Sequence, residues 1–179
     1  MRQNSIKVRK LAFSALYLAI ALVLPFLTGQ IPEIGSMLCP MHIPVLLCGF
    51  MCGWPWGLAV GFIAPLLRSL TLGMPPMFPT GIAMAFELAA YGAVSGVAYR
   101  LLPRKKAYVY VALVIAMVCG RVVWGVVRYL IAGLQSTSFT LEAFWAGAIT
   151  TAIPGIILHI VLIPPLVMLL KRAKLVFED

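Results

Sequence analysis

Six ionisable side chains fall within long apolar stretches of this sequence, where a charge or a hydrogen-bonding group is costly to place. They are His42, Arg68, Glu87, Arg121, Arg128 and His159. Polar and ionisable residues at membrane depth usually face an interior and mark a binding site or a transport path. These residue types can pair with one another or hold an anion. We take all six as candidate substrate-binding residues, together with Trp124.

The arginines among these candidates outnumber the acidic residues. Arg121 and Arg128 are seven residues apart, which places them on the same face of a helix. Glu87 can pair with either of them, and a purely structural pair of Glu87 with Arg121 is one alternative. Three arginines against one glutamate still leave an excess of two positive charges. A bound anion balances such an excess, because a guanidinium binds a carboxylate or phosphate through two hydrogen bonds.

Other candidates also have explanations that need no ligand. Arg68 and Arg128 lie near the predicted outer ends of their helices, where long basic side chains can extend to the headgroups. His42 lies beside a predicted loop, where water is near, and His159 can be a core histidine with satisfied hydrogen bonds. Glu142 falls in the first turn of a predicted helix, where it suits the helix dipole, so we assign it no function.

The sequence lacks the motifs of several enzyme classes. It contains no HExxH, no GxSxG and no GxxxxGK[ST], so we expect no catalytic residue and no ATP hydrolysis by this chain. It contains four cysteines but no CxxC, and we expect no metal site and no cofactor. An intramembrane enzyme that uses Glu87 and the histidines stays an alternative. A structural membrane protein is a second one.

The composition indicates a membrane protein. Of the 179 residues, 63% are hydrophobic and 11% are charged, and the mean hydropathy is +1.04. Soluble domains carry about 25% charged residues. A helix needs roughly 20 residues to cross about 30 Å of hydrocarbon. We therefore predict one all-α domain over residues 1–179, a bundle of six transmembrane helices. The predicted spans are about 11–27, 41–53, 57–72, 80–102, 107–133 and 141–170.

Local signals refine two of these predictions. Pro154, Pro164 and Pro165 predict a kink in the last span. The first apolar run is interpreted as a retained span, because it lacks the small-residue cleavage site of a signal peptide.

The distribution of basic residues predicts the orientation. Eleven of the 14 lysines and arginines precede the first span, join the fourth span to the fifth, or follow the last. A six-span topology puts all three segments on one side, and the positive-inside rule makes that side cytoplasmic. Both termini are therefore predicted to be cytoplasmic. Because this pattern accounts for the charge, no nucleic-acid partner is expected.

Small residues line one face of the first predicted helix. Ala12, Ala15 and Ala19 follow a helical spacing, and Ala15 and Ala19 form a small-xxx-small motif. Such stripes let helices approach closely within a membrane. The sequence allows two roles for this stripe: packing against another helix of this chain, or docking of a partner helix.

The whole sequence resembles the substrate-binding S components of energy-coupling factor (ECF) transporters. The resemblance rests on the size, the six spans, the basic cluster between the fourth and fifth spans, and the alanine motif. It also rests on HIPVLLCGF at 42–50, GLAVG at 57–61 and Arg68-Ser69, which are similar to the second and third spans of that family.

The resemblance implies a function, a location and partners. It implies a subunit of the bacterial cytoplasmic membrane that captures a vitamin or vitamin precursor near the outer face. It also implies docking, through Ala12, Ala15 and Ala19, on a transmembrane coupling subunit that works with two ATP-binding subunits. Because the candidate residues favour an anion, pantothenate is the first substrate expected, followed by a pyridoxine-like or other heterocyclic precursor.

Overall fold

Helices make up every regular element in the described part of the chain, as a lipid environment requires. The structure, a computed structural model, describes residues 2–28, 37–103, 105–136, 140–147, 152–173 and 175–176. Backbone groups that have no water to bond must bond within their own helix. The longer helices are α1 (Arg2–Val23), α3 (His42–Cys52), α4 (Trp54–Leu72), α5 (Ile82–Leu101), α6 (Lys106–Leu134) and α8 (Ile153–Arg172). The shorter ones are η1 (Leu24–Thr28), η2 (Met77–Gly81) and α7 (Leu141–Trp145).

The predicted helical membrane bundle is confirmed, with one difference in length. Five helical segments are long and apolar enough to cross a membrane: Ile6–Leu27, Trp54–Leu72, Met77–Leu101, Lys106–Leu134 and Ile153–Arg172. The second predicted span corresponds to α3, which has only 11 residues and is about 16 Å long. All of its residues are buried. A helix enclosed by protein does not need to match the thickness of the bilayer.

The prediction of one span over 141–170 is wrong at its start. Leu141–Trp145 form the short helix α7, and the long helix α8 begins only at Ile153. Pro154 lies in the first turn of α8, where its missing N–H costs nothing, so it marks a helix start and not an interior kink. The helix continues through Pro164 and Pro165.

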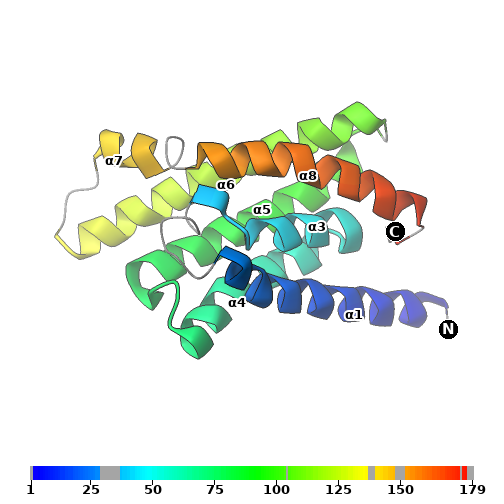
Figure 1. Cartoon of the computed structure of the whole chain (residues 1–179), viewed down its shortest axis with the longest axis horizontal. Coiled ribbons are helices and arrows are strands. Elements are labelled where there is room, and N and C mark those ends of the chain that lie inside the picture. The colour runs from blue at the N-terminus through cyan, green and yellow to red at the C-terminus, as the bar shows by residue number, and fades with distance from the viewer. Residues whose placement is uncertain are drawn as a thin grey trace.

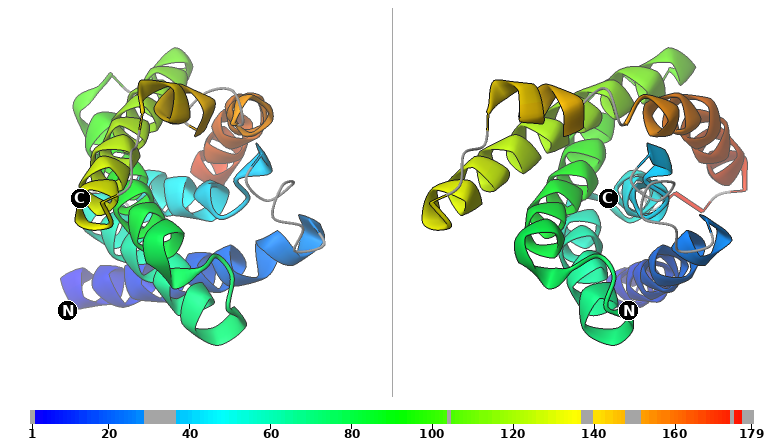
Figure 2. Two further views of the ribbon diagram at one scale, coloured as in Figure 1. Left: turned by 90° about the vertical axis from the view of Figure 1, so that its left-hand side faces the viewer. Right: turned by 60° about the vertical axis from the view of Figure 1, so that its left-hand side comes forward.

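The short helix α3 is the centre of the bundle (Figures 1 and 2). It contacts α1, α4, α5 and α8, and α5 in turn packs between α4 and α6. Glycines bring α4 and α5 together: a Cβ on Gly57 would lie 2.4 Å from Gly92 O, and one on Gly61 would lie 2.2 Å from Leu88 O. Small residues allow such close packing where burial of apolar surface in lipid gives no driving force.

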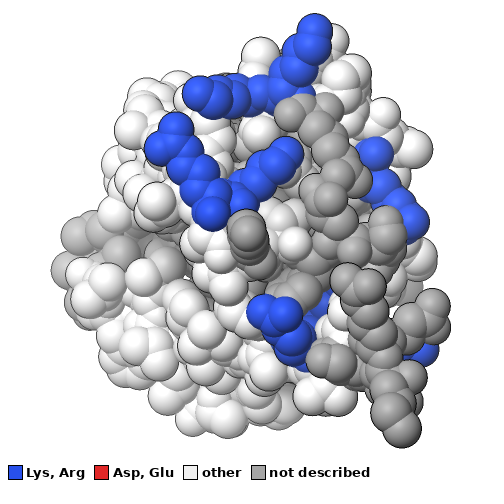
Figure 3. All heavy atoms as spheres, turned by 90° about the vertical axis from the view of Figure 1, so that its right-hand side faces the viewer, with Lys and Arg blue, Asp and Glu red and all other residues white. Residues whose placement is uncertain are grey.

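Both chain ends lie at the same end of the bundle (Figure 1). The face seen from that end carries a group of basic side chains (Figure 3). Exposed lysines and arginines occur at the start of α1, at the end of α5, at the start of α6 and at the end of α8: Lys7, Arg9, Arg100, Lys105, Lys106, Lys171 and Arg172. Arg104 and Lys174, which belong to the same predicted clusters, lie outside the described residues. That this end faces the cytoplasm stays a prediction.

Candidate functional site

Four of the candidate residues come together in the interior, each from a different helix. His42 is the first residue of α3, Glu87 lies in the second turn of α5, Arg121 lies at the middle of α6, and His159 lies in the second turn of α8. The exposed fractions of His42, Glu87 and His159 are only 2%, 1% and 3%. Residues 34 to 117 positions apart in the sequence thus form one buried group, which we call the polar cluster.

An ion pair links two helices of the polar cluster. Arg121 Nη1 lies 2.8 Å from Glu87 Oε1, and His42 Nε2 lies 3.5 Å from the same oxygen. Glu87 therefore pairs with Arg121, one of the two partners that the sequence allowed. The carboxylate balances the charge of Arg121 at a depth where an isolated charge is expensive.

Aromatic and backbone groups fix the two histidines. The Tyr91 ring meets His42 edge-on at 4.9 Å, and the His159 ring stacks on His42 at 5.9 Å. His159 Nε2 lies 3.3 Å from Cys39 O. Gly120 makes room for Tyr91, because a Cβ there would lie 2.6 Å from its ring. The two imidazoles are thus held in a defined orientation.

Two residues of this site were not among the sequence candidates. Tyr91 follows Glu87 by four residues on α5, so it shares its helix face and could have been found by that spacing. The thiol of Cys39 accepts from Arg121 Nη2 at 3.6 Å. Cys39 precedes α3 in a turn with φ 48, and no sequence pattern pointed to that contact.

Arg128 and Trp124 follow Arg121 along α6 towards the outer end predicted from the sequence. Both side chains are half-buried, and the Trp124 ring lies 6.3 Å from Phe144 of α7. A Cβ on Gly125 would lie 2.3 Å from the Phe144 ring, and one on Gly147 would lie 2.5 Å from Trp124. These glycines make room for the rings of Phe144 and Trp124. The face that carries Arg121 therefore continues through an aromatic residue to a second guanidinium.

Arg68 lies apart from the polar cluster. It is 3% exposed, its guanidinium donates to Leu22 O, and it lies 5.1 Å from the centre of the Phe26 ring. Its described contacts are therefore with the end of α1 and with η1. Leu22 lies where α1 gives way to a 3₁₀ turn, so its carbonyl needs a donor from outside the helix.

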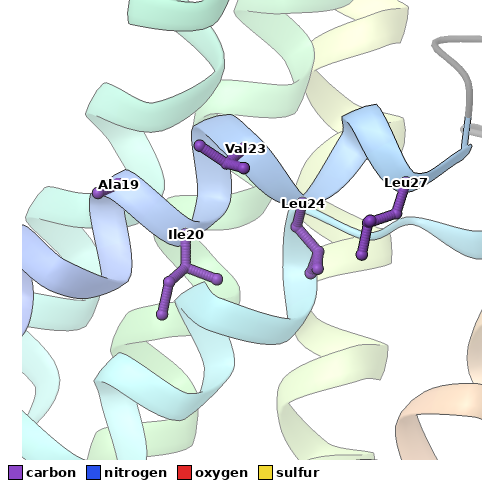
Figure 4. A pocket seen from close by; sticks show the side chains of 5 residues that line it. All are labelled: Ala19, Ile20, Val23, Leu24 and Leu27. Atoms are coloured by element: carbon purple, nitrogen blue, oxygen red, sulfur yellow. The ribbon is translucent and has the colours of Figure 1, made fainter.

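The alanine stripe of α1 points away from the bundle. Ala12, Ala15 and Ala19 are exposed, whereas Ser14 and Tyr17 on the opposite face are buried. The stripe therefore does not pack against the described helices. Beside it lies an apolar hollow of about 310 Å³ (Figure 4). Its lining residues are Ala19, Ile20, Val23, Leu24 and Leu27, so it offers no polar group to a charged ligand.

The described residues include no group of three or more histidines, cysteines and acidic residues that could hold a metal ion. The polar cluster offers two imidazoles, one carboxylate and one guanidinium. This combination can bind a polar organic molecule through directed hydrogen bonds.

Comparison with known proteins gives one match. A protein family described as "ECF transporter, substrate-specific component" matches residues 9–167. This range includes the alanine stripe, the polar cluster, Trp124 and Arg128. Neither the curated proteins nor the solved structures give a match.

Proposed function

This chain belongs to the substrate-specific components of ECF transporters, and we propose that it captures a vitamin-like organic anion between the polar cluster and Arg128. Membership of this family means that the chain is a substrate-binding transport subunit and associates with an ECF module. The identity of the substrate, the residues that hold it and the route of import form the proposal.

The observation that carries the proposal is the polar cluster itself. Glu87 and His42 are almost completely buried, although both are polar and both lie within a membrane bundle. Such groups are costly to bury inside a membrane bundle, so their presence indicates a functional site. A structural ion pair explains Glu87 and Arg121, but it does not explain the two imidazoles stacked beside them.

The charge balance favours an anion. Glu87 offsets Arg121, and Arg68 contacts the end of α1. We assign Arg128 to the substrate because it is half-buried on the face of α6 that carries Arg121 and Trp124. An arginine binds a carboxylate through charge-assisted hydrogen bonds, and Trp124 offers an apolar ring beside it. A pantothenate-like molecule fits this chemistry first, and a pyridoxine-like or other heterocyclic precursor comes second.

Import requires energy from other subunits. The sequence has no phosphate-binding GxxxxGK[ST] motif, so we propose that two ATP-binding subunits hydrolyse ATP and act through a transmembrane coupling subunit. The chain is a multi-pass membrane protein, and we place it in a bacterial cytoplasmic membrane. We assign Ala12, Ala15 and Ala19 to the contact with the coupling subunit.

Native mass spectrometry of the purified protein tests the proposal directly. We expect a small organic acid to be released intact from the detergent-solubilised subunit. Release of a chemically altered product would favour the intramembrane enzyme. If saturating titrations with organic acids and heterocyclic vitamins give no binding and nothing co-purifies, the proposal is wrong. That result would favour a structural membrane protein.

A further inference from the structure

Cys39 contacts three helices of the bundle although it lies in none of them. It precedes α3 and is 8% exposed. Its carbonyl oxygen accepts from the backbone N–H of His42 at 3.0 Å and lies 3.3 Å from His159 Nε2. Its thiol accepts from Arg121 Nη2 at 3.6 Å. One residue thus contacts the members of the polar cluster that come from α3, α6 and α8.

The backbone at Cys39 is held in the left-handed region, with φ 48. This conformation is unfavourable for a residue with a Cβ. Helix α8 packs tightly on the preceding two residues, because a Cβ on Gly155 would lie 2.6 Å from Met37 O and 3.1 Å from Leu38 O. A strained backbone persists only where the surrounding structure determines it. The turn at Cys39 is therefore a fixed point beside the polar cluster.

The thiol of Cys39 determines how the guanidinium of Arg121 lies. Nη1 faces Glu87 Oε1 at 2.8 Å, and Nη2 donates to Cys39 Sγ. Among the described residues, Cys39 supplies the hydrogen-bond acceptor for this side chain. A guanidinium is planar, so two fixed neighbours also fix the direction of its third nitrogen, Nε. Without the thiol, the plane could turn about the ion pair with Glu87.

Four atoms of the polar cluster are buried without a hydrogen-bond partner among the described residues. They are His42 Nδ1, His42 Nε2, Glu87 Oε1 and Arg121 Nε. Arg121 and His42 both lie within 3.5 Å of Glu87 Oε1, but neither contact is a hydrogen bond. Roughly 90% or more of buried polar groups in proteins have a partner. Four exceptions in one cluster indicate a place where another molecule supplies hydrogen bonds.

We infer that Cys39 is a positioning residue of the substrate site: its thiol directs Arg121 Nε towards the substrate, and its carbonyl holds His42 and His159 beside it. This inference rests on the proposed function and deepens it, because it names a residue that sets the geometry of binding. The carbonyl belongs to the backbone and is kept in every substitution. Mutation therefore removes only the thiol, and affinity should depend on whether residue 39 offers a side-chain acceptor.

Three substitutions of Cys39 separate the side-chain acceptor from the backbone. Cys39→Ser keeps an acceptor, Cys39→Ala removes it, and Cys39→Gly removes it and also relieves the positive φ. Calorimetry on the purified full-length subunit measures the affinity, with pantothenate as the first probe and pyridoxine as the second. We expect Cys39→Ser to bind within about twofold of the wild type, and Cys39→Ala and Cys39→Gly to bind about fivefold more weakly.

The melting temperatures should follow a different order from the affinities. Glycine adopts a positive φ without cost, so Cys39→Gly should melt at or above the temperature of Cys39→Ala. If Cys39 only supported the fold, affinity would follow stability, and Cys39→Gly would bind better than Cys39→Ala. Cys119→Ala is the matched control, because Cys119 is a half-buried cysteine of α6 and takes no part in the hydrogen bonds described for the polar cluster. It should bind like the wild type.

The results separate this inference from the proposed function. Equal affinity of Cys39→Ala and the wild type overturns the inference and leaves the proposed function standing, as does a folded Cys39→Ser protein that binds as weakly as Cys39→Ala. If Cys39→Ala does not fold, Cys39→Gly provides the same loss of the acceptor.

Native mass spectrometry covers the case in which neither vitamin binds the wild type. The same comparison is then made on the fraction of each variant that retains the small molecule that co-purifies. Equal retention by all variants overturns the inference alone. If nothing binds and nothing co-purifies, the inference and the proposed function are both wrong.

Discussion

Glu87 Oε1 forms an ion pair with Arg121 Nη1 at 2.8 Å and so joins α5 to α6 inside the bundle. The side chain of Glu87 is 2% exposed, and that of Arg121 is 16% exposed. The pair therefore has a structural part to play as well as a place in the proposed site. Substitution of Glu87 or Arg121 should therefore lower the stability of the fold, whereas substitution of a residue that only contacts substrate should not.

Removal of Arg121 should destabilise the fold. Arg121→Ala leaves the Glu87 carboxylate buried without its cation, which typically costs about 3–5 kcal/mol of unfolding free energy. Thermal unfolding in detergent measures the effect. The double variant Glu87→Gln/Arg121→Ala should recover part of the loss, since no unpaired charge is left. Arg172→Ala, at an exposed site, is the control and should melt like the wild type.

The contact between α4 and α5 should tolerate no added side chain. A Cβ on Gly92 would lie 2.1 Å from Gly57 O, so Gly92→Ala must push the two helices apart. We expect a loss of about 1–3 kcal/mol in stability, as for other overpacked interiors.

A second glycine provides the control for this substitution. Gly133 lies within α6 and has no atom within 4 Å of an added Cβ. Gly133→Ala should therefore leave the melting temperature unchanged or raise it slightly, because alanine is the better helix former. Equal melting temperatures for Gly92→Ala and the wild type would contradict the close packing of α4 and α5.

The sequence predicted which segments form helices better than it predicted where these helices begin and end. Apolar runs and basic flanks are local, so the bundle and the common end of the two termini could be predicted. The predicted bounds 41–53 already made the second span shorter than the others. Its complete burial could not be predicted, because that depends on the four helices around α3. Pro154 was predicted to kink a helix, but it starts one. A proline can lie in the first turn of a helix or at a kink inside one, and the sequence alone does not tell which of the two applies to Pro154.

The site could be predicted only in part. The shared face of Arg121 and Arg128 follows from helical periodicity. The meeting of His42 with Glu87 and His159 depends on how three helices pack, which no spacing within one helix reveals. Arg68 looked equivalent to the other arginines in the sequence. Only the packing of α4 against α1 separates it from them.

The orientation of the bundle can be tested by labelling single cysteines. Ser136 follows α6 and Lys105 precedes it, and both are exposed at opposite ends of that helix. In a cysteine-free background, Ser136→Cys should react with an impermeant maleimide added to intact cells. Lys105→Cys should react only after the cells are opened. Labelling of Lys105→Cys from outside would reverse the predicted orientation.

The exposed alanines should matter for transport and not for substrate binding. Ala15→Leu or Ala19→Leu places a bulky side chain on a face that no described helix covers, so the isolated subunit should fold and bind substrate normally. A partner helix would then be held away, and co-purification with the ECF module and uptake should be lost.

A leucine on another exposed face controls for a general effect on membrane insertion. Val122 is 54% exposed on α6, and Val122→Leu should transport like the wild type. Normal uptake by both alanine variants would show that the stripe faces only lipid.

The proposal of an anionic substrate depends on binding of its carboxylate by Arg128. A carboxylate that binds a guanidinium in a desolvated site gains about 1.5–3 kcal/mol from the charge-assisted bond. Arg128→Ala should therefore weaken binding of the co-purifying substrate at least tenfold, and up to about a hundredfold. The protein should still fold, because Arg128 is only half-buried and is not part of the pair of Glu87 with Arg121.

Arg128→Lys separates recognition of the carboxylate from mere attraction of charge. Lysine keeps the charge but loses the two parallel donors of the guanidinium, so its affinity should fall between those of the wild type and Arg128→Ala. If Arg128 only extends to the lipid headgroups, both variants should bind like the wild type. Unchanged affinity in both would remove the argument for an anionic substrate, whereas a graded loss would assign the carboxylate to this residue.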